Sequence, residues 1–378
     1  MLLGFTACRP DDVLSPADTG GDTTLPDPPT PVDVEVSELG RLLFYDPILS
    51  GNRDVACATC HHPDFGYADG RALSLGIDAT GLGPNRRPND PNNVIGFVSR
   101  NSPTVLNTAF NGIDEDRQVD PAAAPMFWDS RARSLEAQAL LPLESFEEMR
   151  GHAFGLDLAV DSIVARLRQN EVYAGLFAGA FGGNVPVSAS NLATAIAEFE
   201  RTLTARNSPF DRFMAGDLQA MSQAAQAGLE RFNQVGCNDC HNGPMFSDFE
   251  LHVIGVPEHP LLDAPDEGAE GRFAFRTPTL RNLGETGPYF HNGVGGSLQA
   301  TVDFYRRVRG NGGGNNGDGL QLNTNVNRND LDADIRDLGN LNGNAVDEIV
   351  AFLQALDDPD FDRTIPAEVP SGLPVGGR

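Results

Sequence analysis

Two short motifs constrain this chain more than any other feature, because each places two cysteines and a histidine at one fixed spacing. They are Cys57-Ala58-Thr59-Cys60-His61 and Cys237-Asn238-Asp239-Cys240-His241. Cys-x-x-Cys-His is the attachment signature of a c-type haem, in which each thiol bonds to a porphyrin vinyl group and the imidazole binds the iron. A redox or zinc site is the alternative for one copy, but neither chemistry requires the two histidines. The repeat therefore predicts two covalently attached haems.

Length and charge set outer bounds on the fold and on the partners. With 378 residues, the chain is long enough for two domains with their own cores, which suits one haem in each half. The net charge of -26 argues against nucleic acid as a partner, because the phosphate backbone would be repelled. The charge accounts for solubility on its own, and it would also steer a basic redox partner towards the protein.

Cys8 is the one cysteine outside the two motifs. It follows a short apolar run that resembles the end of a bacterial lipoprotein signal, after which the cysteine is acylated. The alternative is a free cysteine, because the basic region and most of the apolar core of a signal are missing. We expect a lipid anchor at Cys8 and a periplasmic location, since covalent c-type haem points to assembly outside the cytoplasm. Residues 9–33, rich in Asp, Pro, Thr and Gly, are predicted to be a disordered tether.

Hydrophobic periodicity predicts helices, whereas strand signals are sparse. Apolar residues recur at helical spacing in residues 37–45, 158–167, 190–203, 222–235, 297–308 and 344–353. Ser188 or Ser190 is expected to cap the third of these helices, and Asn344 the last. Residues 62–125 are rich in Gly, Pro, Asn and Asp, which predicts a long loop region over the first haem, and residues 310–330 are predicted to be an exposed loop.

The predicted fold is therefore mainly α, with two cytochrome-c-like haem domains and long irregular loops. Residues 1–33 would be a signal remnant and tether, residues 34–185 an N-terminal haem domain, and residues 186–378 a C-terminal haem domain. The boundary is expected near residues 183–190.

The sixth ligand of each iron decides the function. His61 and His241 are the predicted proximal ligands; an occupied sixth position suits electron transfer, and an open one suits chemistry on a small molecule. The remaining histidines are His62, His152, His252, His259 and His291. His62 cannot reach the distal side of the haem bound by its neighbour, and the residues alone do not choose among the others.

Several segments that helix or strand periodicity does not explain resemble those of a known family. They are residues 39–44, 57–70, 100–104, 127–132, 277–282 and 288–293. From about Leu39 to Leu356 the chain resembles the bacterial di-haem cytochrome c peroxidases, whose branches include the MauG-like enzymes. The resemblance implies a peroxidatic N-terminal domain and an electron-transfer C-terminal domain.

For the first haem, the resemblance implies an open iron. Some peroxidases cap this iron with a histidine from a loop after the first motif, where this chain has Ile77, so a five-coordinate haem is expected as in MauG-like members. Gln138 and Glu148 match the family's distal glutamine and glutamate. A carboxylate can move a proton between the peroxide oxygens, and an amide can hold the bound peroxide. The alternative for Glu148 is a solvated helix residue, and Glu144 and Glu147 lie close enough to be confused with it.

Between the haems, Trp128 matches a family tryptophan that relays electrons. It is the only tryptophan in the chain, and a buried core indole is the alternative role. Asn101 and the backbone carbonyls of Thr286 and Pro288 match positions that hold a calcium ion, for which oxygen ligands are suited.

Tyr305 matches the position from which peroxidases present a methionine to the second iron, and MauG-like members use tyrosine there. Methionine raises the potential of a haem, whereas a phenolate favours Fe(III) and higher oxidation states. The alternative is that Tyr305 packs on the inner face of its helix. Met221 and Met245 are other thioethers, but both lie outside the family position.

We therefore predict a peroxidase-type oxidoreductase. Hydrogen peroxide would react at the N-terminal haem, with electrons supplied through the C-terminal haem by a c-type cytochrome or another periplasmic donor. The first alternative is MauG-like oxidation of a side chain on a partner protein. The second is a non-catalytic di-haem electron-transfer cytochrome, which would have two six-coordinate haems.

Overall fold

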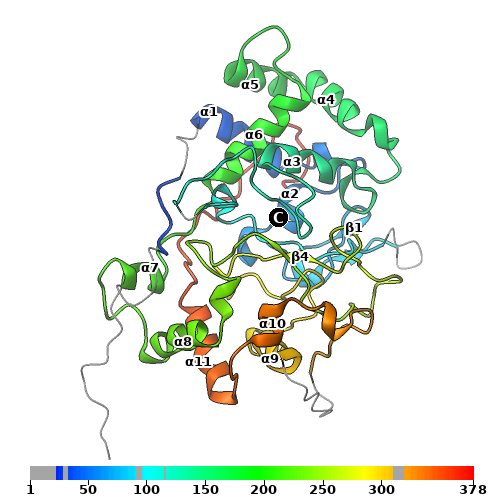
Figure 1. The fold of residues 1–378 in the computed structure, drawn as a ribbon. Helices are drawn as coiled ribbons and strands as arrows, with labels where there is room; N and C mark the ends of the chain where they lie inside the picture. The colour runs from blue at the N-terminus through cyan, green and yellow to red at the C-terminus, as the bar shows by residue number, and fades with distance from the viewer. Residues whose placement is uncertain (1–22, 29–32, 91–95, 115, 310–318) are drawn as a thin grey trace, which may run out of the picture.

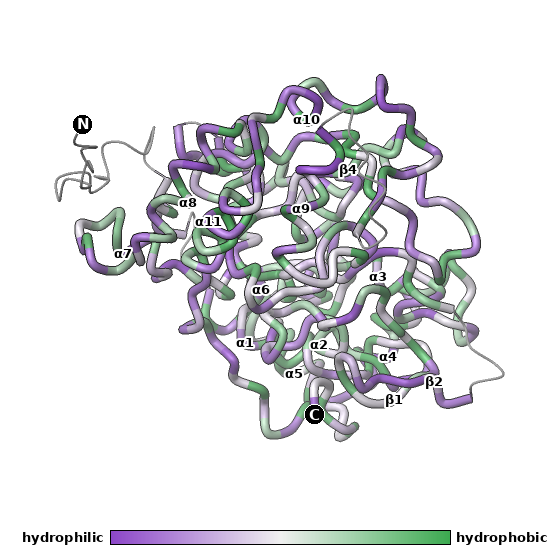
Figure 2. The backbone as a smooth tube through the Cα atoms, turned by 90° about the horizontal axis from the view of Figure 1, so that it is seen from below, coloured by the Kyte–Doolittle hydropathy of each residue, from purple (hydrophilic) through white to green (hydrophobic). Residues whose placement is uncertain are grey.

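The computed structural model describes residues 23–28, 33–90, 96–114, 116–309 and 319–378, and this part of the chain is mainly helical, as predicted (Figure 1). Its only strands are two antiparallel pairs, β1 (Ala79–Thr80) with β2 (Arg87–Pro88) and β3 (Leu251–His252) with β4 (Phe275–Arg276). Hydrophilic and hydrophobic stretches alternate along the tube (Figure 2), and no helix in the described ranges is long and apolar enough to cross a membrane. Cys8 lies outside the described residues.

The helices agree with the predicted periodicity, and several further ones were not predicted. The longer helices are α1 (Val34–Phe44), α3 (Leu135–Glu144), α4 (Ala159–Gln169), α5 (Glu171–Phe181), α6 (Ala189–Thr202), α8 (Gln223–Gln234), α9 (Leu298–Arg309) and α11 (Gly343–Gln354). The shorter ones are α2 (Cys57–Cys60), α7 (Pro209–Met214) and α10 (Ala333–Asp337). Ser188 caps α6 as predicted, because its side chain accepts from the backbone N–H of Asn191. The cap predicted at Asn344 is wrong: α11 begins two residues earlier, where Asn342 accepts from Ala345.

One group of helices forms around the N-terminal half, where α6 packs on α1 and α3, with α4 and α5 beside them (Figure 1). Leu43 of α1 and Leu192 of α6 are fully buried in the same apolar cluster, and burying such a side chain contributes roughly 1.5–3 kcal/mol. Gly40 permits the close crossing of α1 and α6, since a Cβ there would lie 1.8 Å from the carbonyl oxygen of Ala195.

A second group forms around the C-terminal half, where α8 packs on α11 and α9 packs on α10 and α11. Its core contains an edge-to-face group of rings made by Phe210, Phe232, Phe246 and Phe352. Gly228 allows α8 to approach α11, because a Cβ there would lie 2.0 Å from the carbonyl oxygen of Glu348. Each half of the chain therefore has its own apolar cluster.

The predicted domain boundary near residues 183–190 assigns α6 to the C-terminal domain, whereas the packing places this helix in the N-terminal domain. The apolar face of α6 is buried against α1 and α3, and α7 is the first helix that packs in the C-terminal cluster. Residues after α11 also return to the N-terminal half, where the backbone N–H of Gly376 donates to the carbonyl oxygen of Tyr45 at 2.7 Å. We therefore propose a boundary at residues 203–208, with the C-terminal tail packed on the N-terminal domain.

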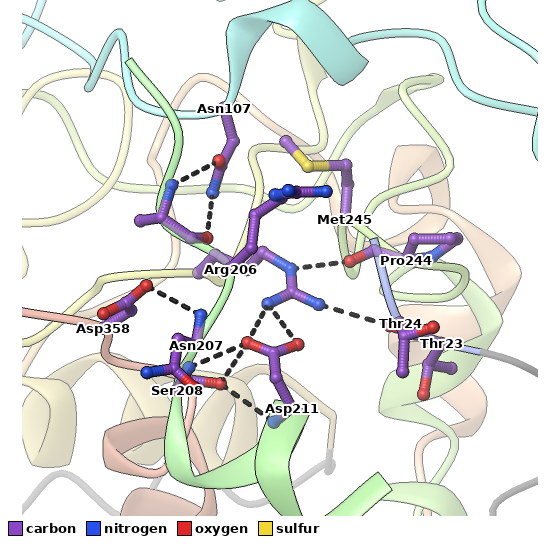
Figure 3. A network of polar contacts seen from close by, with 12 residues as sticks. Thr23, Thr24, Asn107, Arg206, Asn207, Ser208, Asp211, Pro244, Met245 and Asp358 are labelled. Carbon is purple, nitrogen blue, oxygen red and sulfur yellow. Dashed lines mark hydrogen bonds and ion pairs between the residues drawn. The ribbon is translucent and has the colours of Figure 1, made fainter. Parts of the chain in front are cut away.

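Residues 23–28 correct the prediction of a disordered tether. Leu25 is 9% exposed and packs between Phe110 of the N-terminal half and Phe249 of the C-terminal half. Arg281 donates to the carbonyl oxygen of Thr23 at 3.2 Å, to that of Pro244 at 2.7 Å and to the carboxylate of Asp211 at 3.0 Å. Figure 3 labels these three acceptor residues. One apolar side chain and satisfied backbone carbonyls hold this segment, although its composition is polar.

Candidate active site

The first motif places its histidine as an iron ligand requires. The cysteines lie on the single turn of α2, and His61 follows directly. The Nδ1 atom of His61 lies 3.0 Å from the carbonyl oxygen of Tyr67 and 3.3 Å from the hydroxyl of Ser102. A carbonyl acceptor fixes the proton on Nδ1 and leaves Nε2 free to bind a metal. Burial lowers the pKa of His61, which favours the neutral ring that metals bind.

The second motif repeats this arrangement in the C-terminal half. The Nδ1 atom of His241 lies 3.0 Å from the carbonyl oxygen of Phe246, and burial lowers the pKa of this ring as well. In both motifs the Nδ1 atom of the histidine faces a backbone carbonyl from a different loop, which indicates that both rings are oriented to bind iron through Nε2.

The first cavity, of about 360 Å³, gathers the residues predicted for peroxide chemistry. It is lined by Cys57, Cys60 and His61, together with Trp128, Gln138 and Glu148. Gln138 comes from α3, and Glu148 comes from the π-helical turn Phe146–Arg150 that follows it. Burial raises the pKa of Glu148, against the opposing effects of Arg131 and a hydrogen bond from Ser145. Glu144 and Glu147 are not among the described residues that line this cavity.

Ile77 packs away from the first cavity. Its side chain is 4% exposed, lies in the N-terminal apolar cluster with Met149, and fills the space beside Gly151, where a Cβ would come within 1.9 Å of it. The neighbouring Gly76 lets this loop lie against the turn of Glu148, because a Cβ there would lie 2.0 Å from the carbonyl oxygen of Glu147. The loop therefore supports the Glu148 turn and presents no metal-binding atom at Ile77.

The second cavity, of about 200 Å³, brings Tyr305 of α9 together with Cys237, Cys240 and His241. Burial raises the pKa of the Tyr305 phenol. The alternative thioethers lie elsewhere: Met245 packs with Leu25, and Met221 packs in the C-terminal apolar cluster. The structure thus brings Tyr305, and neither methionine, to the cavity of the second motif.

Two other histidines, His252 and His291, line the second cavity. His252 lies between Asp248 at 2.9 Å and Asp332 at 2.5 Å, so both ring nitrogens have carboxylate partners. Asp248, the thiol of Cys240 and Asp332 raise the pKa of His252 above its usual range. His291 stacks on Phe275 with ring centroids 3.6 Å apart, and burial lowers its pKa to about 3.

Trp128 lines both cavities and is 8% exposed. Its indole N–H donates to the carbonyl oxygen of Asn101 at 2.9 Å, and its own carbonyl accepts from the backbone N–H of Arg276 at 2.6 Å. An ion pair of Arg100 with the adjacent Asp129, at 2.6 Å, holds the same turn. The indole is therefore fixed at the boundary between the two cavities.

The three residues predicted to hold calcium lie around the same cavity. Asn101, Thr286 and Pro288 all line the second cavity. The side-chain N–H of Asn101 donates to the carbonyl oxygen of Arg71 at 2.7 Å, which leaves its amide oxygen available as a ligand. An amide and two carbonyl oxygens are ligands of the kind that calcium takes.

Sequence reasoning missed one titratable group in the first cavity. Glu200 of α6 is 4% exposed, one of its carboxyl oxygens forms no hydrogen bond with a described residue, and burial raises its pKa to about 8. The signal was available, because Glu200 lies four residues after Ile196 and shares the inward face of the helix.

These features define a class: a mainly helical protein with two haem-attachment motifs in neighbouring cavities that share Trp128 as a lining residue. The sequence model of the family described as di-haem cytochrome c peroxidase matches residues 34–219. Methylamine utilization protein MauG of Methylorubrum extorquens is 36% identical over 280 residues, which cover 73% of this chain and 69% of that protein. Cytochrome c551 peroxidase of Nitrosomonas europaea is 31% identical over 342 residues, which cover 88% of this chain and 83% of that protein.

A solved MauG-like protein associated with microbial copper homeostasis has the same fold, with a TM-score of 0.69, 26% identity, and coverage of 88% of this chain and 93% of that one. The chain belongs to the di-haem cytochrome c peroxidase family. Membership implies two c-type haems and an oxidoreductase of the peroxidase type, which confirms the family, the enzyme class and the haem cofactor predicted from the sequence.

Proposed function

We propose that the first cavity reduces hydrogen peroxide to water and that electrons reach it through the second cavity. The observation that supports this most is the meeting of His61, Gln138 and Glu148 in one cavity, with Trp128 shared with the cavity of His241. The overall reaction consumes two electrons and two protons for each peroxide, and it forms two molecules of water.

The cysteines of each motif are proposed to hold the haems through thioether bonds, with His61 and His241 as proximal ligands. A haem bound there supplies an iron that binds peroxide in the first cavity and exchanges electrons in both. Glu148 would take the proton from the nearer peroxide oxygen and return it to the farther one, which becomes the leaving water. Its raised pKa suits this transfer, because the carboxyl group is a stronger base than an exposed one.

Gln138 is proposed to donate its side-chain N–H to the bound peroxide and to hold the peroxide beside Glu148. Trp128 is proposed to relay electrons, because its indole lies at the boundary of the two cavities. Ile77 has no atom that could occupy the open side of the first iron, so no reductive opening of this site is expected.

Tyr305 would be a second protein ligand of the haem iron that His241 binds. Burial favours the neutral phenol, and a ferric centre would have to offset this for the phenolate to bind. Its presence in place of methionine favours a second candidate, MauG-like oxidation of a side chain on a partner protein. A purely electron-transferring cytochrome would lack a use for Gln138 and Glu148.

Further proposals concern calcium and location. A calcium ion would bind the oxygens of Asn101, Thr286 and Pro288, which share the second cavity. A periplasmic location follows from the attachment of c-type haem outside the cytoplasm, and acylation of Cys8 would anchor the protein to a membrane.

The test is steady-state peroxide consumption by the purified di-haem protein, with and without a reduced c-type cytochrome. Fast turnover that depends on the cytochrome supports the peroxidase. Rapid oxidation of the haems with little cytochrome turnover favours the protein-substrate alternative. A resting spectrum of two low-spin six-coordinate haems, with no reaction towards peroxide, would reject both enzymes.

A further inference from the structure

Arg276 is a buried arginine of β4 that lines the second cavity, and its residue exposure is 8%. Its Nε donates to the carbonyl oxygen of Phe127 at 2.9 Å, and one Nη donates weakly to the carbonyl of Thr277 at 3.4 Å. Its backbone N–H binds the carbonyl oxygen of Trp128 at 2.6 Å. Arg276 therefore binds the consecutive backbone carbonyls of Phe127 and Trp128.

Among the described residues no carboxylate lies within the 4 Å of an ion pair with Arg276; its guanidinium group lies over the ring of Phe249, with Cζ 5.8 Å from the ring centroid. Asp129 acts on it only from a longer distance, and burial lowers its pKa to about 10, which still leaves a cation at neutral pH. A buried charge is strongly unfavourable unless it is paired. An anion bound in the cavity would therefore stabilise Arg276.

Two other buried arginines show how this protein ordinarily satisfies such groups. Arg281 forms a pair with both carboxylate oxygens of Asp211 at 3.0 Å. Arg86 uses all three side-chain nitrogens on backbone carbonyls of the loop around it. Arg276 does neither, since its second Nη forms no hydrogen bond with a described residue while the side chain lines a cavity.

We propose that Arg276 binds a propionate carboxylate of the second haem. The inference rests on the proposed attachment of that haem at Cys237 and Cys240. A guanidinium group matches a carboxylate in shape and charge, and the low polarity of the cavity strengthens the pair. Because the same residue holds the carbonyls of Phe127 and Trp128, it fixes the edge of the second haem relative to the indole that lines both cavities. Arg276 is thus a positioning residue for electron transfer.

The experiment compares three variants of the purified di-haem protein. R276Q removes the charge, R276K keeps the charge but removes the planar fork, and R272Q is the matched control, because Arg272 is 59% exposed and pairs with Glu270. Resonance Raman spectroscopy measures the propionate bending bands, and spectroelectrochemistry measures the midpoint potential of the second haem.

We expect R276Q to shift a propionate band and to lower the potential, because loss of a nearby cation disfavours the added electron. R276K should shift the band but keep most of the potential, and R272Q should change neither. If R276Q fails to fold, the propionate band of R276K provides the test instead. Unchanged propionate bands in either folded variant would overturn the proposal, even if the potential fell.

The haem content distinguishes a failure of the Arg276 proposal from a failure of the proposed haem attachment at Cys237 and Cys240. A wild-type protein with one haem per chain would overturn the second haem site itself. Two haems per chain in the wild type and in R276K, with identical propionate bands, would overturn only the role of Arg276.

Discussion

Replacement of Glu148 by glutamine tests the proposed chemistry most directly. The substitution keeps the size and shape of a half-buried side chain in the first cavity but removes the group that accepts a proton. General acid–base catalysis contributes about 10²- to 10⁴-fold to a rate, which corresponds to roughly 2.7–5.4 kcal/mol at about 1.36 kcal/mol for each factor of ten. We therefore expect kcat for peroxide reduction to fall by about this range in E148Q.

The assay is the initial rate of peroxide consumption with a reduced c-type cytochrome, after haem content and the resting spectrum have been matched to the wild type. E147Q is the control, because Glu147 lies on the same turn but does not line the cavity. Burial raises the pKa of Glu148 and its carboxylate form must accept the proton, so the wild-type rate should fall as pH decreases through that raised value. The rate of E148Q should not show this decrease at low pH. A kcat for E148Q within about threefold of the wild type would lie far below the expected effect of acid–base catalysis and would refute the role.

Other predictions concern the second haem, the N-terminal segment and a buried ion pair. Y305F should retain two haems but change the absorption spectrum of the second one, and an unchanged spectrum would exclude Tyr305 as a ligand. L25A should destabilise the protein by about 2 kcal/mol, the lower end for a buried leucine, measured by denaturant unfolding; no loss would mean that residues 23–28 contribute little. Asp248 and Asp332 raise the folded pKa of His252 above 6.5, so its contribution of about 1.5–3 kcal/mol is complete below pH 6.5 and is lost as pH rises through the raised value. H252Q should therefore lower the melting temperature more at pH 6 than at pH 10.5, and equal losses would contradict the ion pair.

Local chemistry explains why the haem sites could be predicted. Attachment of a c-type haem needs two thiols and an imidazole within five consecutive residues, so the whole signal is contiguous in the sequence. The same holds for α6, whose inward residues repeat every three or four positions and whose cap at Ser188 is a local hydrogen bond. The errors occurred where local signals were weak. Two neighbouring asparagines, Asn342 and Asn344, could each cap α11, and the polar composition of residues 23–28 concealed the burial of Leu25.

Resemblance to a family supplied Gln138, Glu148, Trp128 and Tyr305, which no spacing rule would have selected. These residues come from separate elements, and their meeting depends on how α3, α9 and the intervening loops pack. The structure brings the first three to one cavity and Tyr305 to the other. The roles of these residues remain predictions for the assays above.

The sequence alone determined the two haem-attachment motifs, the helical class and the family, because these depend on neighbouring residues or on patterns along the chain. Only the tertiary structure decided which ionisable groups are buried without an ion pair among the described residues. Glu200 and Arg276 are ordinary surface residue types in the sequence, and the energetic cost of their burial arises only when other segments close around them. The shared position of Trp128 has the same origin, since it requires two halves of the chain to meet at one side chain.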